Sequence, residues 1–491
     1  MPHSSHSNRR SLLKASLSFS AVYLAGCGGG AAAEDPTASI SAAPGVEPPP
    51  SPAPSPAQVP TPTPPPPPPP LPAPAPPQGL AALPPATQPV APSPTPLSPL
   101  PAWLTPVGTV ADLSLNTVDE GAGRRVSFWK AWSGVGWAPW WGRLGSVIIA
   151  GGGHVDGSEN DIYRFDVEAR TVVRIKESAP SFFKPIAGAP VADKVTGWMW
   201  ANSDLNDPST QEGELFAAHE YSGLQAIPGS AIPGLGASNG WLFAAGRAVM
   251  PLNGTEQSVA GFKLRLGLDQ KWTHQGPLTH AKVEGHDPVY YTKGTCYDAR
   301  RRLVWFKAGQ SSPSTSMCYR NTVDGSSGYL TFSNVDRING VDGYQVLEYA
   351  SAHDCIIQGC EIIGSTPKEY TRVRVWDLAT GRAYQPAQMG TKMPAPHSTW
   401  AMCWSDVWNC MVFVTGQGDN TVYFCKPTGN PRTDPWQWSS QTVAGTVRTG
   451  YTASGGAPSF NRLRHCTALG NVLIWCGRTD EPIQMIHVSP P

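Results

Sequence analysis

The histidines are the side chains whose type and spacing are best suited to chemistry. Nine of the eleven lie after residue 107. An imidazole titrates near neutral pH, binds metal ions and serves as a general base. If the apolar runs around them are strands arranged in a ring, several imidazoles converge on the mouth of its central channel. Six stand before or between such runs, and we take them as the candidate ligand-binding residues: His154, His219, His286, His353, His397 and His465.

Three interpretations of these six histidines remain open. The first, which repeated positions favour, is a structural histidine bonded to neighbouring backbone. The second is contact with a bound ligand, and the third is metal binding or catalysis. No metal-binding or phosphate-binding motif supports the third, because the sequence contains no HExxH or phosphate-loop pattern. We therefore identify no catalytic residue.

A denser polar group, 154–161 with the sequence HVDGSEND, offers carboxylates to a cation. Asp156, Glu159 and Asp161 are oxygen ligands of the type that calcium takes. The group lacks the regular acidic spacing of a helix-flanked calcium loop, and loops between strands are polar in any case. We therefore expect no metal and no cofactor, with calcium kept as the alternative.

Nine cysteines lie between residues 296 and 476, and no two of them form a CxxC motif. This spacing disfavours a zinc ribbon or a redox motif. Disulfides persist in an oxidising compartment, and two pairs of cysteines fall on facing strands of one expected hairpin each. The candidate disulfides are Cys403 with Cys410 and Cys466 with Cys476. The alternative is that these thiols are small buried hydrophobic groups.

The elements that must position these side chains are strands. After residue 107, short runs rich in Val, Ile, Trp, Tyr and Phe alternate with Gly, Asn, Asp and Pro turns, and no helical periodicity is sustained. This pattern predicts an all-β domain. A hairpin phrase at 296–306 recurs at 403–413 and 466–475, with further copies at 137–149 and 353–364. A second phrase follows some of these copies about a dozen residues later, as at 162–173 and 373–381.

Repeated four-stranded antiparallel units are typical of a β-propeller. Seven blades fit the spacing, and six is the alternative. The last unit lacks a fourth strand, and we expect 107–135 to supply it and close the ring, which removes an exposed edge. The units are placed at 137–175, 185–228, 238–276, 289–333, 346–388, 397–441 and 460–488.

A double glycine, Gly151 and Gly152, ends the second strand of the first unit, and an aromatic run at 162–166 follows in its third. These residues resemble the kelch repeat of bacterial propellers similar to the central domain of galactose oxidase. The resemblance implies a kelch-type propeller over 107–491 in architecture, but it covers only one unit as a motif. It does not imply copper oxidation, because that family's copper site needs adjacent Tyr and His residues, and this chain has no Tyr-His dipeptide.

Residues 1–26 have the pattern of an export signal. Arg9 and Arg10 precede a short apolar run, as in secretory and twin-arginine signals, and the run is too short to span a bilayer. Residues 24–27, LAGC, resemble the bacterial lipobox, which makes Cys27 the acylated residue, and Gly28 implies retention at the outer membrane. Residues 44–101 then contain 28 of the 53 prolines, which predicts a disordered, extended tether over 27–106.

The overall charge is balanced, with 36 basic and 36 acidic residues, so it does not favour binding to nucleic acid. We expect a monomeric lipoprotein of the bacterial envelope, facing the periplasm or the cell surface and touching the membrane through its lipid anchor only. Its propeller is expected to bind a glycan or protein partner without catalysis. The alternatives are an enzyme that acts on polysaccharide at the channel mouth and a purely structural envelope component.

Overall fold

A computed structural model describes much of the chain after residue 82. The chain divides into two compact units, 1–71 and 72–491, and every described residue belongs to the second. The predicted signal, Cys27 and most of the predicted tether lie outside the described residues. The described ranges are 83–86, 88, 95–114, 117–119, 125–127, 134–149, 162–176, 212–213, 223–232, 240–244, 251–252, 255–256, 262–266, 272–274, 294–307, 316–323, 326–333, 341–363, 372–394, 400–448, 461–477 and 482–491.

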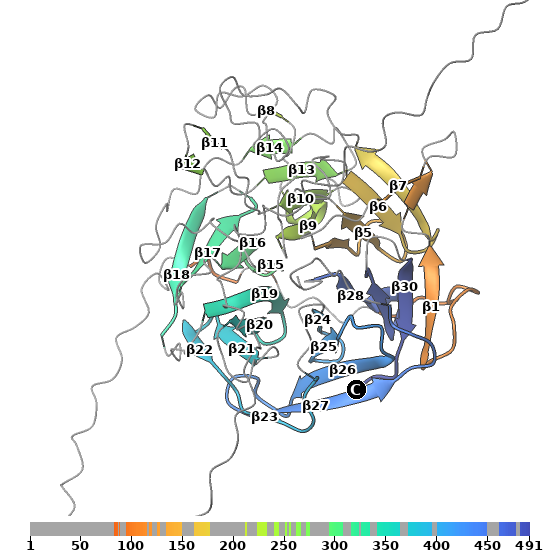
Figure 1. Ribbon diagram of the computed structural model, residues 1–491. Coiled ribbons are helices and arrows are strands. Elements are labelled where there is room, and N and C mark those ends of the chain that lie inside the picture. The colour runs from red at the N-terminus through yellow and green to blue at the C-terminus, as the bar shows by residue number, and fades with distance from the viewer. Residues whose placement is uncertain are drawn as a thin grey trace, which may run out of the picture. The chain divides into compact units, whose positions relative to one another are not determined.

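The domain is an all-β propeller, in which sheets stand around a common centre (Figure 1). Five sheets come from consecutive stretches of chain. Their strands are β4 (Gly136–Ala138), β5 (Ser146–Ile149), β6 (Ile162–Asp166) and β7 (Thr171–Lys176); β8 (Glu212–Gly213), β9 (Leu224–Pro228), β10 (Gly240–Ala244), β13 (Phe262–Leu266) and β14 (Trp272–His274); β15 (Gly294–Asp298), β16 (Leu303–Lys307), β17 (Ser316–Asn321) and β18 (Ser327–Thr331); β19 (Val341–Ala350), β20 (Cys355–Ile363), β21 (Arg372–Asp377) and β22 (Arg382–Tyr384); and β23 (Gln388–Met389), β24 (Ala401–Ser405), β25 (Cys410–Val414), β26 (Thr421–Pro427) and β27 (Trp436–Thr442).

One further sheet joins the two ends of the domain, and we call it the closing sheet. It contains β28 (Leu463–Cys466), β29 (Val472–Trp475) and β30 (Ile483–His487), and its outer strand is β1 (Thr109–Ser114). Thr109 pairs with His487 and Asp112 with Gln484 in an antiparallel ladder. The expectation that 107–135 supplies the missing strand is confirmed. Among the described residues, the remaining elements are two small hairpins and two 3-10 turns: β2 (Thr117–Asp119) with β3 (Arg125–Ser127), β11 (Pro251–Leu252) with β12 (Thr255–Glu256), η4 (Gly229–Ala231) and η5 (Thr467–Leu469).

The expected count of seven units is wrong. The units placed at 185–228 and 238–276 contribute strands to a single sheet, ordered β8-β14-β13-β10-β9. Turn residues between two apolar runs occur in any hairpin, so in the sequence the connection between β9 and β10 cannot be told from a boundary between units. The β9–β10 pairing, from Leu224 opposite Ala244 to Pro228 opposite Gly240, shows that the two strands belong to one sheet.

The core is divided into layers between neighbouring sheets. Every residue of β24 and β25 is buried, because each inner strand has a sheet packed on both sides. This explains why such strands are continuous apolar runs and not alternating ones. Trp400 and Trp436 fill the layer against the β19–β22 sheet, whereas Trp408 and Trp475 fill the layer against the closing sheet.

The innermost strands contact one another in the order β4, β9, β15, β19, β24 and β28. Side chains complete the circuit between the closing sheet and the β4–β7 sheet. The Asn461 side chain accepts a hydrogen bond from the Val135 N–H at 2.9 Å and donates one to the Val135 carbonyl at 3.0 Å. The ring is therefore closed at both its inner and its outer strands.

Part of the predicted tether is bound to the propeller. The Gln88 N–H donates to the Arg300 carbonyl in the β15–β16 turn (3.1 Å), and the Leu97 N–H donates to the Ala468 carbonyl in the β28–β29 turn (2.9 Å). The Trp103 side chain packs against the core between the closing sheet and the β4–β7 sheet. The tether expected over 27–106 is thus not free chain along its whole length, because its described residues contact the propeller.

Removing β1 should open the closing sheet. A chain that begins at residue 116 leaves the edge of β30 unpaired and exposes apolar side chains such as Met485. We expect its thermal unfolding temperature to fall by at least about 5 °C, and we expect self-association through the free edge. Differential scanning calorimetry and light scattering measure both, with a chain beginning at residue 83 as the control. Equal stability and a monomeric state for the shorter chain would contradict the proposed importance of this strand.

Candidate functional site

Two of the six candidate histidines lie in the described residues, and both are held in contacts between sheets. His353 lies in the β19–β20 turn, where its Nε2 bonds Asn409 Oδ1 of the next sheet. Its carbonyl accepts a hydrogen bond from Arg432 Nη2, which also binds Asp377. An imidazole fixed in this way links neighbouring sheets, which supports the structural interpretation at this position.

His465 is buried at the end of β28. Ser405 Oγ bonds its Nδ1 at 2.8 Å, the Gly470 carbonyl bonds its Nε2 at 2.6 Å, and the Trp408 indole stacks on the ring with centroids 4.0 Å apart. Burial lowers the pKa of the imidazole to about 4, since the charged form loses its hydration. His465 is thus a neutral link between β24 and β28.

The other four candidates, His154, His219, His286 and His397, lie outside the described residues, so the expected convergence of six imidazoles stays a prediction. The polar group 154–161 is also outside them. Within the described ranges, no group of three His, Cys, Asp or Glu side chains is arranged to hold a metal ion. The same ranges contain no helix long and apolar enough to cross a membrane.

The expected disulfides are not formed. Cys403, Cys410, Cys466 and Cys476 are all free and buried. The register gives the reason, because Cys403 lies opposite Val412 and Cys410 lies opposite Ser405. Cys466 lies opposite Val472, and Cys476 follows the end of β29. Burial raises the pKa of the Cys410 and Cys466 thiols to about 12, so the alternative interpretation as small hydrophobic groups is the one observed.

Charged side chains meet near the centre of the ring. Arg464 on β28 donates to the carboxylate of Glu348 on β19 at 2.8 Å, although the β23–β27 sheet separates their two sheets. Arg464 also donates to the Val135 carbonyl at 3.1 Å. Burial raises the pKa of the Glu348 carboxyl, and Arg464 opposes that shift. These groups bind one another across the inner strands.

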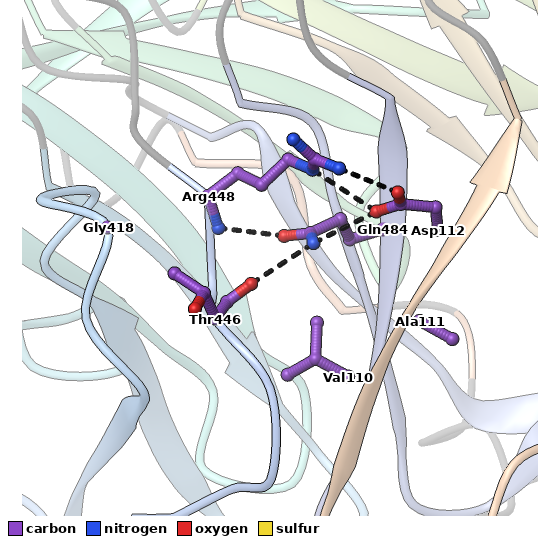
Figure 2. Close-up of a pocket in the computed structure, with 7 residues that line it drawn as sticks. All are labelled: Val110, Ala111, Asp112, Gly418, Thr446, Arg448 and Gln484. Carbon is purple, nitrogen blue, oxygen red and sulfur yellow. Dashed lines mark hydrogen bonds and ion pairs between the residues drawn. The ribbon is translucent and has the colours of Figure 1, made fainter.

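A cavity of about 490 Å³ opens where β1 and β30 meet the segment that follows β27, and we call it the seam pocket (Figure 2). Its size is within the range of small-molecule sites. Three parts of the chain supply its walls: β1, the 418–448 region and β30. The lining residues are Val110, Ala111, Asp112, Gly418, Thr446, Arg448 and Gln484.

One hydrogen-bonded group forms the polar wall of the seam pocket. Arg448 donates to Asp112 through Nη2 (2.7 Å) and Nε (3.2 Å), and Gln484 Nε2 donates to the same carboxylate at 3.1 Å. Gln484 also accepts from the Arg448 N–H (2.8 Å) and donates to the Thr446 carbonyl (3.2 Å). The dashed contacts in Figure 2 show this fixed arrangement. The cavity wall is therefore preformed.

The wall is charged but compensated. The Asp112 and Arg448 side chains remain 44% and 36% exposed, so a ligand in the cavity reaches both. The hydrogen bond from Arg448 holds the pKa of the Asp112 carboxyl below its usual value, so the carboxylate is ionised and paired at neutral pH. The Trp475 indole donates to the Arg448 carbonyl at 3.0 Å and fixes that segment on the closing sheet.

Sequence reasoning missed these residues for a clear reason. Asp112 and Arg448 are 336 positions apart, and neither belongs to a motif. Only the expectation that the first strand completes the last sheet brings them near each other. Given that pairing, the signal in the sequence for a polar site was an acid on the first strand, Asp112, opposite a polar residue on the last strand, Gln484.

No family model and no curated protein matches the chain. Solved structures that match part of it include a Bacteroides thetaiotaomicron VPI-5482 protein of unknown function, with 8% identity, a TM-score of 0.42 and coverage of 77% of this chain and 74% of that one. The Malassezia sympodialis allergen Mala s 1 matches with 13% identity, a TM-score of 0.39 and coverage of 71% and 91%. The Cps50 (Swd1) β-propeller domain of Myceliophteria thermophila matches with 11% identity, a TM-score of 0.26 and coverage of 52% and 62%.

The buried His465 should make stability depend on pH. Its folded pKa of about 4 lies below the ordinary value of 6.5, so the unfolded chain binds a proton at higher pH than the folded chain does. The contribution of neutral His465 to the free energy of unfolding is complete above about pH 6.5 and is lost as the pH falls toward 4. The loss is about 3 kcal/mol.

Urea unfolding of the wild type and of His465→Gln at pH 7 and pH 4.5 measures this effect. The variant should lose less stability between the two values than the wild type loses. Ser405→Ala is the control, because it removes a partner but keeps the titrating group. An unchanged pH dependence in His465→Gln would show that the imidazole does not titrate as described.

Proposed function

We propose that this protein is a tethered binding module of the bacterial envelope, whose propeller takes up a glycan or protein partner without transforming it. The seam pocket carries this proposal, because its wall is a hydrogen-bonded set of polar groups that a ligand can reach. The balanced charge of the chain, 36 basic and 36 acidic residues, agrees with a partner of low net charge.

The contacts of the histidines favour binding over catalysis. His353 and His465 are engaged between sheets, which removes two of the six side chains on which the enzymatic alternative rests. Within the seam pocket, the carboxylate of Asp112 is bonded to a guanidinium and an amide. A carboxylate held in this way binds and orients, and its lowered pKa makes it a poor proton donor.

The N-terminal sequence supports the lipid anchor and the location at the outer membrane. The LAGC phrase with Cys27 supports acylation, Gly28 supports retention at the outer membrane, and the proline tract supports a spacer that holds the domain away from the lipid surface. We further infer that the blades are of kelch type, on the residues Gly151 and Gly152. The module acts as a monomer and needs no cofactor.

Binding without turnover is the expected behaviour of the full chain. Purified in mild detergent, it should bind a subset of an array of neutral, amino and acidic glycans. Chromatography of the same oligosaccharides after long incubation should show no products. The release of shorter products would favour the enzymatic alternative. If no glycan binds, the glycan form of the proposal is wrong. Affinity capture then tests the remaining form, in which the partner is a protein.

Replacing Cys27 should release the protein from membranes. In a bacterial host fed labelled palmitate, the wild type should carry label and sediment with outer membranes, because acylation supplies a hydrophobic anchor. Cys27→Ala should carry no label and should lose its outer-membrane association. Substitution at Cys296, which lies in the propeller, is the matched control and should leave labelling unchanged. A labelled Cys27→Ala variant would overturn the anchor assignment.

A further inference from the structure

The walls of the seam pocket come from both ends of the propeller. Asp112 lies on β1, the first strand of the domain, whereas Gln484 lies on β30, the last. Arg448 belongs to the segment that follows β27 and bonds both of these residues. The cavity therefore exists only while β1 is paired with β30 and both lie against the neighbouring sheet.

Other bonds tie the same three segments together beside the cavity. The Val110 N–H donates to the Ala444 carbonyl at 2.9 Å, and the Ala444 N–H donates to the Gly108 carbonyl at 2.7 Å. The Arg448–Asp112 pair is the charged member of this set and the one most exposed to a ligand. A molecule that contacts Asp112 and Thr446 together would add a further connection across the seam.

The charges of the wall restrict the class of ligand. An anion would approach the Asp112 carboxylate, which already occupies Nε and Nη2 of Arg448. A cation would approach a carboxylate that the guanidinium neutralises. A neutral ligand avoids both problems, and it should carry groups that both donate and accept, because the wall exposes a carboxylate that accepts and a guanidinium that donates. A hydroxyl does both.

Resting on the binding function proposed above, we propose that the seam pocket binds a neutral, hydroxyl-rich unit of a glycan, and that this binding is coupled to closure of the ring by β1. The coupling follows from mass action. A ligand that binds only the closed ring increases the free energy of opening. The increase grows with the logarithm of the ratio of ligand concentration to dissociation constant. The bound glycan thus adds contacts that stabilise the closing sheet.

Three substitutions test the site. Asp112→Asn removes one charge with little change of shape, Arg448→Gln removes the other, and Thr446→Val replaces an exposed hydroxyl without touching the ion pair. For the neutral glycan bound most tightly by the full-length wild type on the array, calorimetric titration should show at least tenfold weaker binding to Asp112→Asn and Arg448→Gln. Thr446→Val should weaken it by about threefold.

Arg143→Gln is the matched control, because Arg143 forms a similarly exposed ion pair with Glu168 on the β4–β7 sheet. It should bind within twofold of the wild type. Circular dichroism and the unfolding temperature without glycan establish that each variant is folded. Should the first two variants unfold, Thr446→Val alone decides the site.

The coupling is tested by unfolding the full-length chain at rising glycan concentration. The unfolding temperature of the wild type and of Arg143→Gln should increase, and that of Arg448→Gln should not. If glycans bind but all variants retain wild-type affinity, the site is wrong and the binding function stands. Preference for acidic glycans would overturn the ligand class. Failure of every glycan to bind the wild type would overturn both this inference and the glycan form of the proposed function.

Discussion

The pairing of β1 with β30 is the contact on which the rest of the domain depends. Each sheet of a propeller is covered on its faces by its two neighbours, so the ring has no independent core that would persist if one position opened. In this chain the closing sheet supplies one wall of two core layers, one against β4–β7 and the other against β23–β27. The ladder from Thr109–His487 to Asp112–Gln484 therefore supports the core layer that contains Trp408.

Polar contacts near the ends of the innermost strands also join neighbouring sheets, in addition to the apolar layers between them. Arg301 binds Asp354 across one boundary, His353 binds Asn409 across the next, and Ser405 binds His465 across the one after that. The side chains differ, but their places in successive sheets correspond. Two of the candidate histidines, His353 and His465, thus lie at such boundaries between sheets.

The sequence was sufficient for the fold class and for the closing strand, because apolar runs and turns carry that information locally. It overcounted the units, since the turn between β9 and β10 looks the same as a turn between two sheets. It also misjudged the cysteines: Cys403 and Cys410 are on facing strands, but a facing strand does not fix which residues are opposite one another. The seam pocket could not be predicted, because Asp112 and Arg448 become neighbours only when the ring closes.

The contacts of the N-terminal segment determine the order in which tension would reach the domain. A force applied along the chain from residue 83 loads the Gln88–Arg300 bond and then the Leu97–Ala468 bond, which lie on different sheets. Only after these break does the load reach β1, beginning at Thr109. Asp112 lies toward the opposite end of that strand. Separation of β1 from its Thr109 end would therefore reach Asp112 only after Thr109, Val110 and Ala111 had left β30, so the Asp112 wall of the seam pocket would outlast the first half of the strand.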